Sequence, residues 1–481
     1  MFIPGEEAFG AIDEWSPDPG SVVCWHPSPA SLTNVRQAPV SAVPASHQQA
    51  RHLRNFRDHA NRGADMSRLC IGSWDMPGQC DIRVLTYVIN AHLRRHDTYH
   101  SWFEFADGDR IVRHTVRKPT DIQLAPVKHG EMTTEAWREH ILATPSPLEW
   151  DCFRFAIIQR PDNFTFCFVI DHLFIDAQFM GAIGVEFYLM YSALLAGGAP
   201  LSLPAAGSYD EYAVRQHEYT SALTLDSPPI RAWVDFFERN DGTLPECPVS
   251  LGDGSGSVDL MFVRVMDEHQ TAEFESVCIA GGARFSGGVF ACAALAQYEL
   301  TGAETYCGLV ARDLRSTPAE FATIGWFTGF VPITIPVEPA SFGDMARAAQ
   351  ESFDLCKDLA EVPFNRVLEL APWLSMPQGR VPLLFHLDAS APPLSTIVNN
   401  DWNGTNVKIH HDGKVPARFD LRVNRYEKET QVIVFFPNNP VARESVARYV
   451  AALKSAFTRV AEGGYAAAPL SHGAGFQRQV V

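Results

Sequence analysis

The most constraining feature of this sequence is a hydrophobic stretch in its first half that ends at a histidine. The runs CFRFAIIQ and FTFCFVID have the composition of buried strands, and the turn residues Arg160-Pro-Asp-Asn163 between them predict a hairpin. His172 follows directly, and a long apolar helix is expected from about Ala177. The pattern predicts a mixed α/β fold in which an imidazole stands at a strand end, from where it can reach into a cleft.

His172 and Asp176 form an H-x-x-x-D pattern with a chemical meaning. An imidazole that titrates near neutral pH can take a proton from a hydroxyl as that oxygen attacks a carbonyl. An acid four residues later can fold back to fix the ring or the turn. However, roughly one such pattern arises by chance in a chain of this histidine content. The alternative interpretation is a strand-end histidine with Asp176 as a helix N-cap.

The length of 481 residues favours two or three domains. Strand and helix patterns alternate in both halves, with helices predicted over residues 46–62, 81–95, 134–142 and 441–460, whereas the first 40 residues read as irregular. The Gly- and Ser-rich stretch PVSLGDGSGS is the best linker. We therefore predict an N-terminal unit at 1–247, a linker at 248–257 and a C-terminal unit at 258–481, with the substrate site in the cleft between the units.

Composition excludes several classes of function. The net charge of −17 argues against nucleic acid as a partner. The N-terminal segment MFIPGEEAFGAIDEW does not read as a signal peptide, and the apolar segment 177–196 contains Gln178 and Glu186, which favours a buried helix over a membrane span. The 10 cysteines form no C-x-x-C pair and read as buried thiols of a cytosolic protein and not as a disulfide framework.

Two histidine groups suggest other chemistry. His92, His96 and His100 would share one face of a continuous helix, which invites a zinc site, but the helix is expected to end near Asp97, so ordinary surface and helix-end histidines are favoured. The segment HHDG at 410–413 lacks the three-residue spacer and reads as a hairpin turn. Neither a G-x-S-x-G motif nor a P-loop is present.

Segments along nearly the whole chain resemble motifs of one superfamily, in its order. The stretch around His172 resembles the HHxxxDG motif of condensation domains and chloramphenicol-acetyltransferase-like enzymes. Further resemblances are RHDTYHSWF at 95–103 to RHExLRTxF, LEWDCFR at 148–154 to the segment before the hairpin, ARD at 311–313 with IGWFTGFVP at 324–332 to GR…IGxFxNxxP, and RFDLRV at 418–423 to a late FDL strand. Within this superfamily the chain most resembles the polyketide-associated acyltransferases of mycobacteria, on WSPDPGSVVCWHPSP, NAHLRRHDTYHSWFEF, IDHLFIDAQFMG and IGWFTGFVPITIPV.

The resemblance implies two chloramphenicol-acetyltransferase-like subdomains that form a V-shaped pseudo-dimer with a tunnel between them. It makes His172 the general base and Asp176 the structural acid, paired with an arginine of the second half, for which Arg312 is preferred and Arg315 is the alternative. Residues expected along the tunnel are Gly325, Trp326 and Thr328.

Two positions depart from the motif. Asp171 stands where the first histidine is expected, and Ala177 replaces the glycine. The first histidine is not usually the base, so activity is still expected, and Asp171 could bias the surroundings of His172.

The implied reaction moves a long acyl chain to a hydroxyl of trehalose or a trehalose glycolipid. The donor is acyl-CoA or an acyl chain on a polyketide synthase, and no metal or redox cofactor is implied. We expect a cytoplasmic monomer, with peripheral contact at the inner face of the membrane compatible with greasy products. Two alternatives stay open: a catalytically idle scaffold that binds a carrier protein or lipid, and an amide-forming condensation enzyme.

Overall fold

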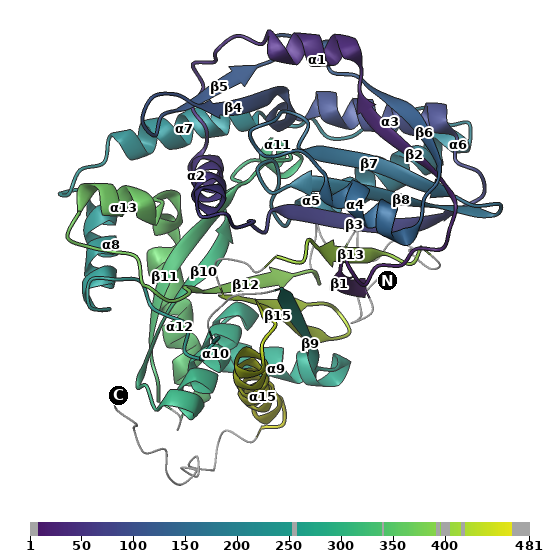
Figure 1. Cartoon of the computed structure of the whole chain (residues 1–481). Coiled ribbons are helices and arrows are strands. Elements are labelled where there is room, and N and C mark those ends of the chain that lie inside the picture. Colours follow the sequence, from purple (N-terminus) through teal and green to yellow (C-terminus); the bar gives the residue numbers. More distant parts are fainter. Residues whose placement is uncertain are drawn as a thin grey trace.

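Two mixed β-sheets, one above the other in Figure 1, form the framework of the protein. The computed structural model describes residues 8–252, 257–338, 341–390, 395, 405–414 and 419–463. We call the seven-stranded sheet with its helices the N-lobe and the six-stranded sheet with its helices the C-lobe. The predicted α/β architecture of two units is therefore confirmed.

The N-lobe sheet has the order β1-β13-β3-β8-β7-β2-β6, and its pairs are antiparallel except for β1 with β13. Its strands are β1 (Phe9–Ala11), β2 (Ser21–Pro27), β3 (Leu69–Pro77), β6 (Leu124–Glu131), β7 (Phe153–Gln159), β8 (Asn163–Asp171) and β13 (Lys408–His411). The associated helices are α1 (Pro29–Arg36), α2 (His47–Asn61), α3 (Ile82–Arg95), η2 (Asp97–His100), η3 (Pro119–Asp121), α4 (Thr134–Leu142), α5 (Phe179–Ile183), η4 (Gly184–Leu189) and α6 (Met190–Leu195). A separate hairpin consists of β4 (Ser101–Phe105) and β5 (Ile111–Thr115).

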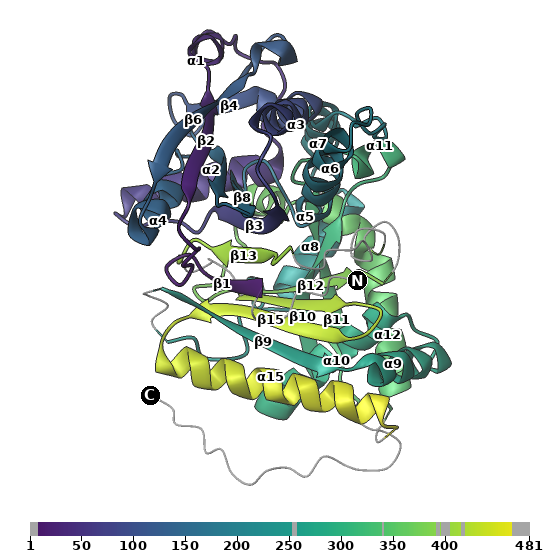
Figure 2. The same cartoon turned by 90° about the vertical axis from the view of Figure 1, so that its right-hand side faces the viewer.

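The C-lobe sheet has the order β11-β10-β12-β14-β15-β9. Its strands are β9 (Val258–Met266), β10 (Thr305–Asp313), β11 (Thr328–Pro336), β12 (Pro382–Asp388), β14 (Phe419–Arg425) and β15 (Thr430–Pro437). The remaining helices are α7 (Tyr209–Ser221), α8 (Pro228–Glu238), α9 (Glu268–Ala280), α10 (Phe285–Thr301), α11 (Pro318–Phe321), α12 (Phe342–Cys356), η5 (Lys357–Glu361), α13 (Phe364–Leu370) and α15 (Pro440–Ala461). Figure 2 shows α9, α10 and α15 along the side of this sheet that faces away from the N-lobe.

Both faces of the N-lobe sheet are buried, as the hydrophobic run in β8 requires. Side chains alternate along a strand, so Phe166 and Phe168 pack with α3 and α5, whereas Cys167 and Val169 pack with Trp137 of α4 on the opposite face. A strand that is buried on both faces reads as a continuous apolar run. This packing fixes the direction in which the end of β8 points.

The two halves of the sequence are interleaved. Strand β13, from the second half, pairs antiparallel with β3 and lies on the side of the N-lobe that faces the C-lobe (Figures 1 and 2). Conversely, Tyr209 of α7 and Trp233 of α8 are buried in hydrophobic clusters of the C-lobe, although both precede the predicted linker. Residues 253–256 of that linker lie outside the described residues, and the boundary at 248–257 stays a prediction.

Most helices were predicted within a residue or two, but short strands were missed. The stretch SVVCWHP forms β2 inside the segment read as irregular, because its residues pair with β7 on one side and β6 on the other. The reading of HHDG as a hairpin turn is wrong, since His410 and His411 belong to β13. The buried Asp412 carboxylate accepts hydrogen bonds from the backbone N–H groups of Arg68 and Leu69.

The apolar segment 177–196 is buried and helical, as predicted, and the prediction of cysteines without a disulfide framework is confirmed, although only five of the ten are fully buried. Phe179, Ile183, Phe187 and Tyr191 of that segment are buried in the N-lobe. In the described part of the chain no single helix is long and apolar enough to cross a membrane, although α9 and α10, bent by 97°, pass that test together. All 10 cysteines carry free thiols.

Candidate active site

His172 is the first residue after β8, on the side of the N-lobe that meets the C-lobe. Its backbone N–H donates to the carbonyl of Arg68 at 2.9 Å, and the three residues that follow it are buried in the N-lobe core. Its own side chain stays partly exposed. The ring faces the indole of Trp326 from the C-lobe, with centroids 5.7 Å apart. The local sequence thus fixes the backbone of His172 and leaves its imidazole on the side of the N-lobe that faces the C-lobe.

Asp171 lies in the core, with no exposed surface. Its carboxylate accepts hydrogen bonds from His52 Nε2 and Arg68 Nη1, each at 2.7 Å, and from the N–H of Leu173 at 2.9 Å. Burial alone would raise the pKa of Asp171, but His52 and Arg68 hold it below its ordinary value. Asp171 is therefore ionised at neutral pH, and its charge is balanced locally.

Helix α2 brings His52 to this point. A capping box starts the helix, because Ser46 accepts from the N–H of Gln49 and the Gln49 side chain accepts from the N–H of Ser46. The amide of Gln49 also donates to the carbonyl of Leu173 at 3.3 Å. Sequence reasoning missed His52 and Arg68, since both are distant from Asp171 along the chain.

Asp176 joins the two lobes through Arg315. Arg315 donates from Nη1 to Asp176 Oδ2 at 2.9 Å and from Nη2 to Oδ1 at 3.2 Å. The side chains are 1% and 5% exposed, so the pair is buried. The N–H of Phe327 donates to Asp176 Oδ2 at 2.9 Å, and the N–H of Gln178 donates to Oδ1 at 3.1 Å. Asp176 thus fixes the turn after His172 against the C-lobe.

The preferred partner of Asp176, Arg312, was wrong, and the alternative Arg315 is correct. Arg312 is the penultimate residue of β10, and its Nη1 donates to the carbonyl of Lys357 at 2.5 Å and lies 3.5 Å from Asp358 Oδ1. Arg315 lies beyond the strand end, where the chain turns toward the N-lobe. The end of β10 therefore decides which arginine reaches across.

The loop that carries Trp326 is held by N-lobe residues and by α7. The N–H of Ile324 donates to His96 Nδ1 at 3.2 Å, and the hydroxyl of Tyr209 donates to the carbonyl of Trp326 at 3.1 Å. The Trp326 indole also contacts the ring of His52, with centroids 5.5 Å apart. Trp326 therefore lies against both His52 and His172.

His96 belongs to a buried polar cluster behind this loop. His96 Nε2 lies 3.0 Å from Glu186 Oε1, and His92 Nδ1 lies 2.7 Å from Glu186 Oε2. Arg95 Nε donates to the same carboxylate at 3.0 Å. The neighbouring imidazoles hold the pKa of Glu186 well below its ordinary value against the opposing effect of burial. The described cluster is close enough to hold a metal ion, but its carboxylate is already saturated with donors.

The zinc reading of three histidines on one helix is not supported. His100 follows the end of α3, and its Nε2 lies 3.0 Å from the carbonyl of Leu93. His92 and His96 contact Glu186 of η4 instead, and all three histidines are buried, so the favoured reading as surface histidines is also wrong.

Gly325 touches an aromatic ring. A Cβ at this position would lie 2.2 Å from Cδ2 of Tyr209. No side chain larger than hydrogen fits without moving either the loop or α7. The residue therefore sets the position of the neighbouring Trp326.

We expect Gly325→Ala to lower the free energy of unfolding by about 1–3 kcal/mol through this overpacking. It should also slow catalysis, because Trp326 moves relative to His172. Urea denaturation and a rate assay measure the two effects. Gly10→Ala is the matched control, since the nearest atom to its new Cβ is 3.8 Å away. Equal values for both variants would contradict the proposed role of Gly325.

Thr328 begins β11 and lines a pocket next to the Trp326 loop. Its carbonyl accepts a hydrogen bond from the side-chain amide of Gln48. The pocket lies between α2, β11 and α13, and its lining includes His47, Arg51, Arg54, Thr328, Phe330 and Phe364. The guanidinium of Arg51 lies 5.3 Å from the centroid of Phe330.

Comparisons with known proteins match most of this chain. Residues 72–388 match the family model of the condensation domain. The chain is 51% identical to "Acyltransferase PapA3" of Mycobacterium tuberculosis (strain ATCC 25618 / H37Rv), over 96% of this chain and 99% of that protein. It is 53% identical to "Trehalose-2-sulfate acyltransferase PapA2" of Mycobacterium bovis (strain BCG / Pasteur 1173P2), over 94% and 97%. A solved structure, "PapA2 acyl transferase", superposes with a TM-score of 0.91 at 52% identity and covers 95% of this chain and 100% of that one.

Proposed function

Because this chain belongs to the condensation-domain family and, within it, to the PapA acyltransferases, we propose that it transfers a long acyl chain from a thioester to a hydroxyl of trehalose or a trehalose derivative. That the chain is an O-acyltransferase follows from the family. The acceptor, the donor and the residues that act are our proposal. The observation that carries it is the partly exposed imidazole of His172 at the meeting point of the lobes, facing Trp326.

In this mechanism His172 is the general base. An imidazole nitrogen takes the proton of the acceptor hydroxyl as its oxygen attacks the thioester carbonyl carbon. A C–O bond forms, and the resulting tetrahedral oxyanion collapses with cleavage of the C–S bond. The imidazolium returns its proton to the departing thiolate, so the enzyme ends in its starting state. Since a thioester is already activated, alignment of the two substrates supplies much of the catalysis and no acyl-enzyme is needed.

Asp176 positions other residues and does not react itself. Its carboxylate is occupied by Arg315 and by the N–H of Phe327, so it holds the His172 turn and the Trp326 loop in register. Asp171 has a similar positioning role inside the N-lobe core, where it connects α2 to the end of β8. In this proposal neither carboxylate exchanges a proton with substrate.

The pocket beside Thr328 is our proposed acceptor site. One relative is named for trehalose-2-sulfate, an acceptor that carries an anionic group. Arg51 supplies positive charge, and Phe330 and Phe364 supply aromatic faces. Arg54 also lines the pocket, but its Nε donates to Asp109 at 2.6 Å. Burial is the main cause that lowers the pKa of His47 to about 4, so this histidine is neutral at pH 7. Arginine recognises sulfate through paired, charge-assisted hydrogen bonds.

The first test is the reaction itself. We expect the purified protein to convert palmitoyl-CoA and either trehalose or trehalose-2-sulfate into an ester, detected by mass spectrometry and cleaved by hydroxylamine. The same acceptors are then offered with palmitate on an acyl-carrier protein, which separates the two donors. Acylation of an amine in preference to both sugars, or no product from either donor, would refute the proposal.

The acceptor site is tested by substituting one arginine inside the pocket and one outside it. Arg51→Ala should raise KM for trehalose-2-sulfate about tenfold or more while kcat changes little, because a charged hydrogen bond contributes about 1.5–3 kcal/mol. The control Arg62→Ala removes an exposed cation at the C-cap of α2, outside the pocket lining. Equal KM values for the two variants would place the acceptor elsewhere.

A further inference from the structure

A second histidine cluster, with a cysteine, lies on the N-lobe away from β8. Cys24 and His26 are alternate residues of β2 and therefore point to the same face of the sheet. His140 comes from α4, which packs on that face. Cys24 Sγ lies 3.1 Å from His140 Nε2. Because β7 separates β2 from β8, these residues serve a different place from His172.

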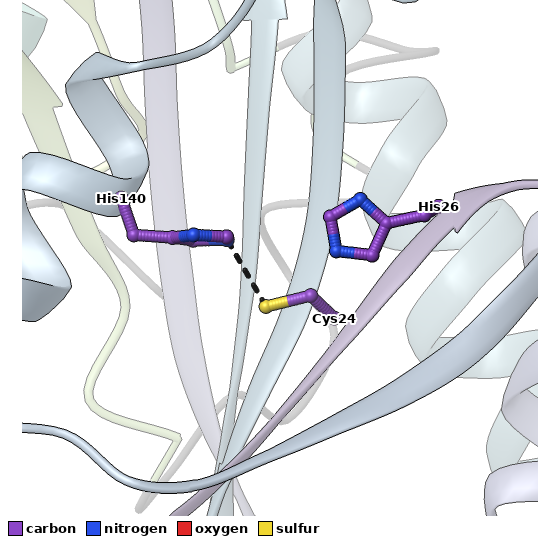
Figure 3. Close-up of side chains that lie close together, drawn as sticks. All are labelled: Cys24, His26 and His140. Carbon is purple, nitrogen blue, oxygen red and sulfur yellow. Dashed lines mark hydrogen bonds between the residues drawn. The ribbon is translucent and has the colours of Figure 1, made fainter.

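The donor atoms of these residues converge. Figure 3 shows the Cys24 sulfur between the imidazoles of His26 and His140. One ligand atom from each residue lies within 4.8 Å of the other two. His129, an exposed residue of β6, approaches from solvent, with its Nε2 3.3 Å from His26 Nε2.

We propose that Cys24, His26 and His140 bind a divalent cation of the zinc class, with His129 as the fourth ligand. A thiolate with imidazoles is a donor set typical of zinc, whereas Mg²⁺ and Ca²⁺ require oxygen ligands. No assignment of the acyl-transfer site depends on this cation. Its contribution would be to tie β2, β6 and α4 together at the edge of the N-lobe sheet.

The separations inside the trio of Cys24, His26 and His140 approach those around a tetrahedral ion, whereas His129 would have to move in from solvent to join them. Bond lengths of about 2.0 Å to nitrogen and about 2.3 Å to sulfur put two nitrogen ligands about 3.3 Å apart and a sulfur and a nitrogen about 3.6 Å apart. The observed separations are 3.3 Å between His26 Nε2 and His129 Nε2 and 3.1 Å between Cys24 Sγ and His140 Nε2. The other two separations within the trio lie within 4.8 Å, so binding requires side-chain shifts of up to about 1.5 Å.

Binding exchanges one cation for another at this cluster. A bound metal ion replaces the thiol proton of Cys24, and each imidazole offers the lone pair of one ring nitrogen.

Metal binding at His140 requires Arg154 to give up one contact. Its Nη1 lies 3.3 Å from His140 Nε2, while its Nη2 donates to the carbonyl of Ala143 at 2.6 Å. A cation on His140 Nε2 displaces only the first contact. The guanidinium keeps the bond to Ala143 and remains beside the new thiolate, which attracts it.

Cobalt spectroscopy of the whole protein tests the site directly. The protein is stripped with chelator and titrated with Co²⁺, and then with Zn²⁺ in competition with a chromophoric chelator. We expect equimolar binding, a sulfur-to-cobalt charge-transfer band and the intense visible bands of tetrahedral cobalt. Zinc should bleach these bands and raise the thermal midpoint of unfolding. A wild-type spectrum without the charge-transfer band, or zinc binding weaker than about 10 μM, would overturn the proposal.

Single substitutions locate the ligands. Cys24→Ser should abolish the charge-transfer band, and His140→Gln should weaken zinc binding at least about tenfold. The controls are Cys80→Ser and His114→Gln, which lie outside this cluster and should leave the spectrum unchanged. Retention of the charge-transfer band in Cys24→Ser would refute the site. If that variant fails to fold, the wild-type spectrum still decides whether cobalt is bound to sulfur.

Discussion

His172→Ala should lower kcat for acyl transfer about 10²–10⁴-fold, the usual effect of removing a general base. The loss falls on kcat because the substrates still bind, while the hydroxyl has no group to take its proton during attack. Single-turnover measurement of ester formation at saturating palmitoyl-CoA gives the rate of the chemical step.

The substitution should leave folding nearly intact. The His172 side chain is partly exposed, and the turn that carries it is held by Asp176 and by the buried residues after it. The control His59→Ala removes a half-buried histidine of α2 whose Nδ1 contacts the carbonyl of Asn55. A folded His172→Ala protein that transfers acyl chains at the wild-type rate would show that His172 is structural, and the mechanism above would be wrong.

Asp176→Ala should cost about 3–5 kcal/mol of unfolding free energy, the usual result of removing one partner of a buried ion pair. The Arg315 side chain is 1% exposed, so it would lose its fork of hydrogen bonds to Asp176 without gaining water. The Trp326 loop would also lose the bond from the N–H of Phe327. We therefore expect acyl transfer to fall with stability. Urea denaturation measures the first effect, and kcat at low temperature, where the variant stays folded, measures the second.

Arg312 and Arg315 form a matched pair for this prediction. Arg315→Ala should resemble Asp176→Ala, because it removes the other partner of the same buried ion pair and leaves the Asp176 carboxylate without this guanidinium. Arg312→Ala should change stability by no more than about 0.5 kcal/mol, because its ionic partner Asp358 is 85% exposed and such surface pairs contribute little. A large loss for Arg312→Ala with a small loss for Arg315→Ala would contradict the assignment of the ion pair.

The His172 and Asp176 substitutions together distinguish a residue that takes part in the chemical step from one that positions other residues. The His172 substitution should reduce the rate with stability unchanged, whereas the Asp176 substitution should reduce both. If both variants lost only activity, Asp176 would contribute more to the chemical step than its contacts suggest.

The sequence predicted well wherever a feature depends on neighbours along the chain. The apolar runs before His172 predicted the hairpin of β7 and β8, and the 3.6-residue spacing predicted α3 and α15. The order of motifs identified the superfamily, because a series of local patterns is hard to obtain by chance. His172 at a strand end followed from the same local reasoning.

The tertiary structure alone decided the features that join distant segments. Strand β13 has only the residues Lys408–His411, so its sequence carries little signal, and its place beside β3 depends on pairing across most of the chain. The choice of Arg315 over Arg312 depends on where β10 ends and on how the lobes face each other. His52 reaches Asp171, and Cys24 reaches His140, for a similar reason. Local sequence determines which way a backbone segment turns, but only the packing of two lobes determines which side chains meet.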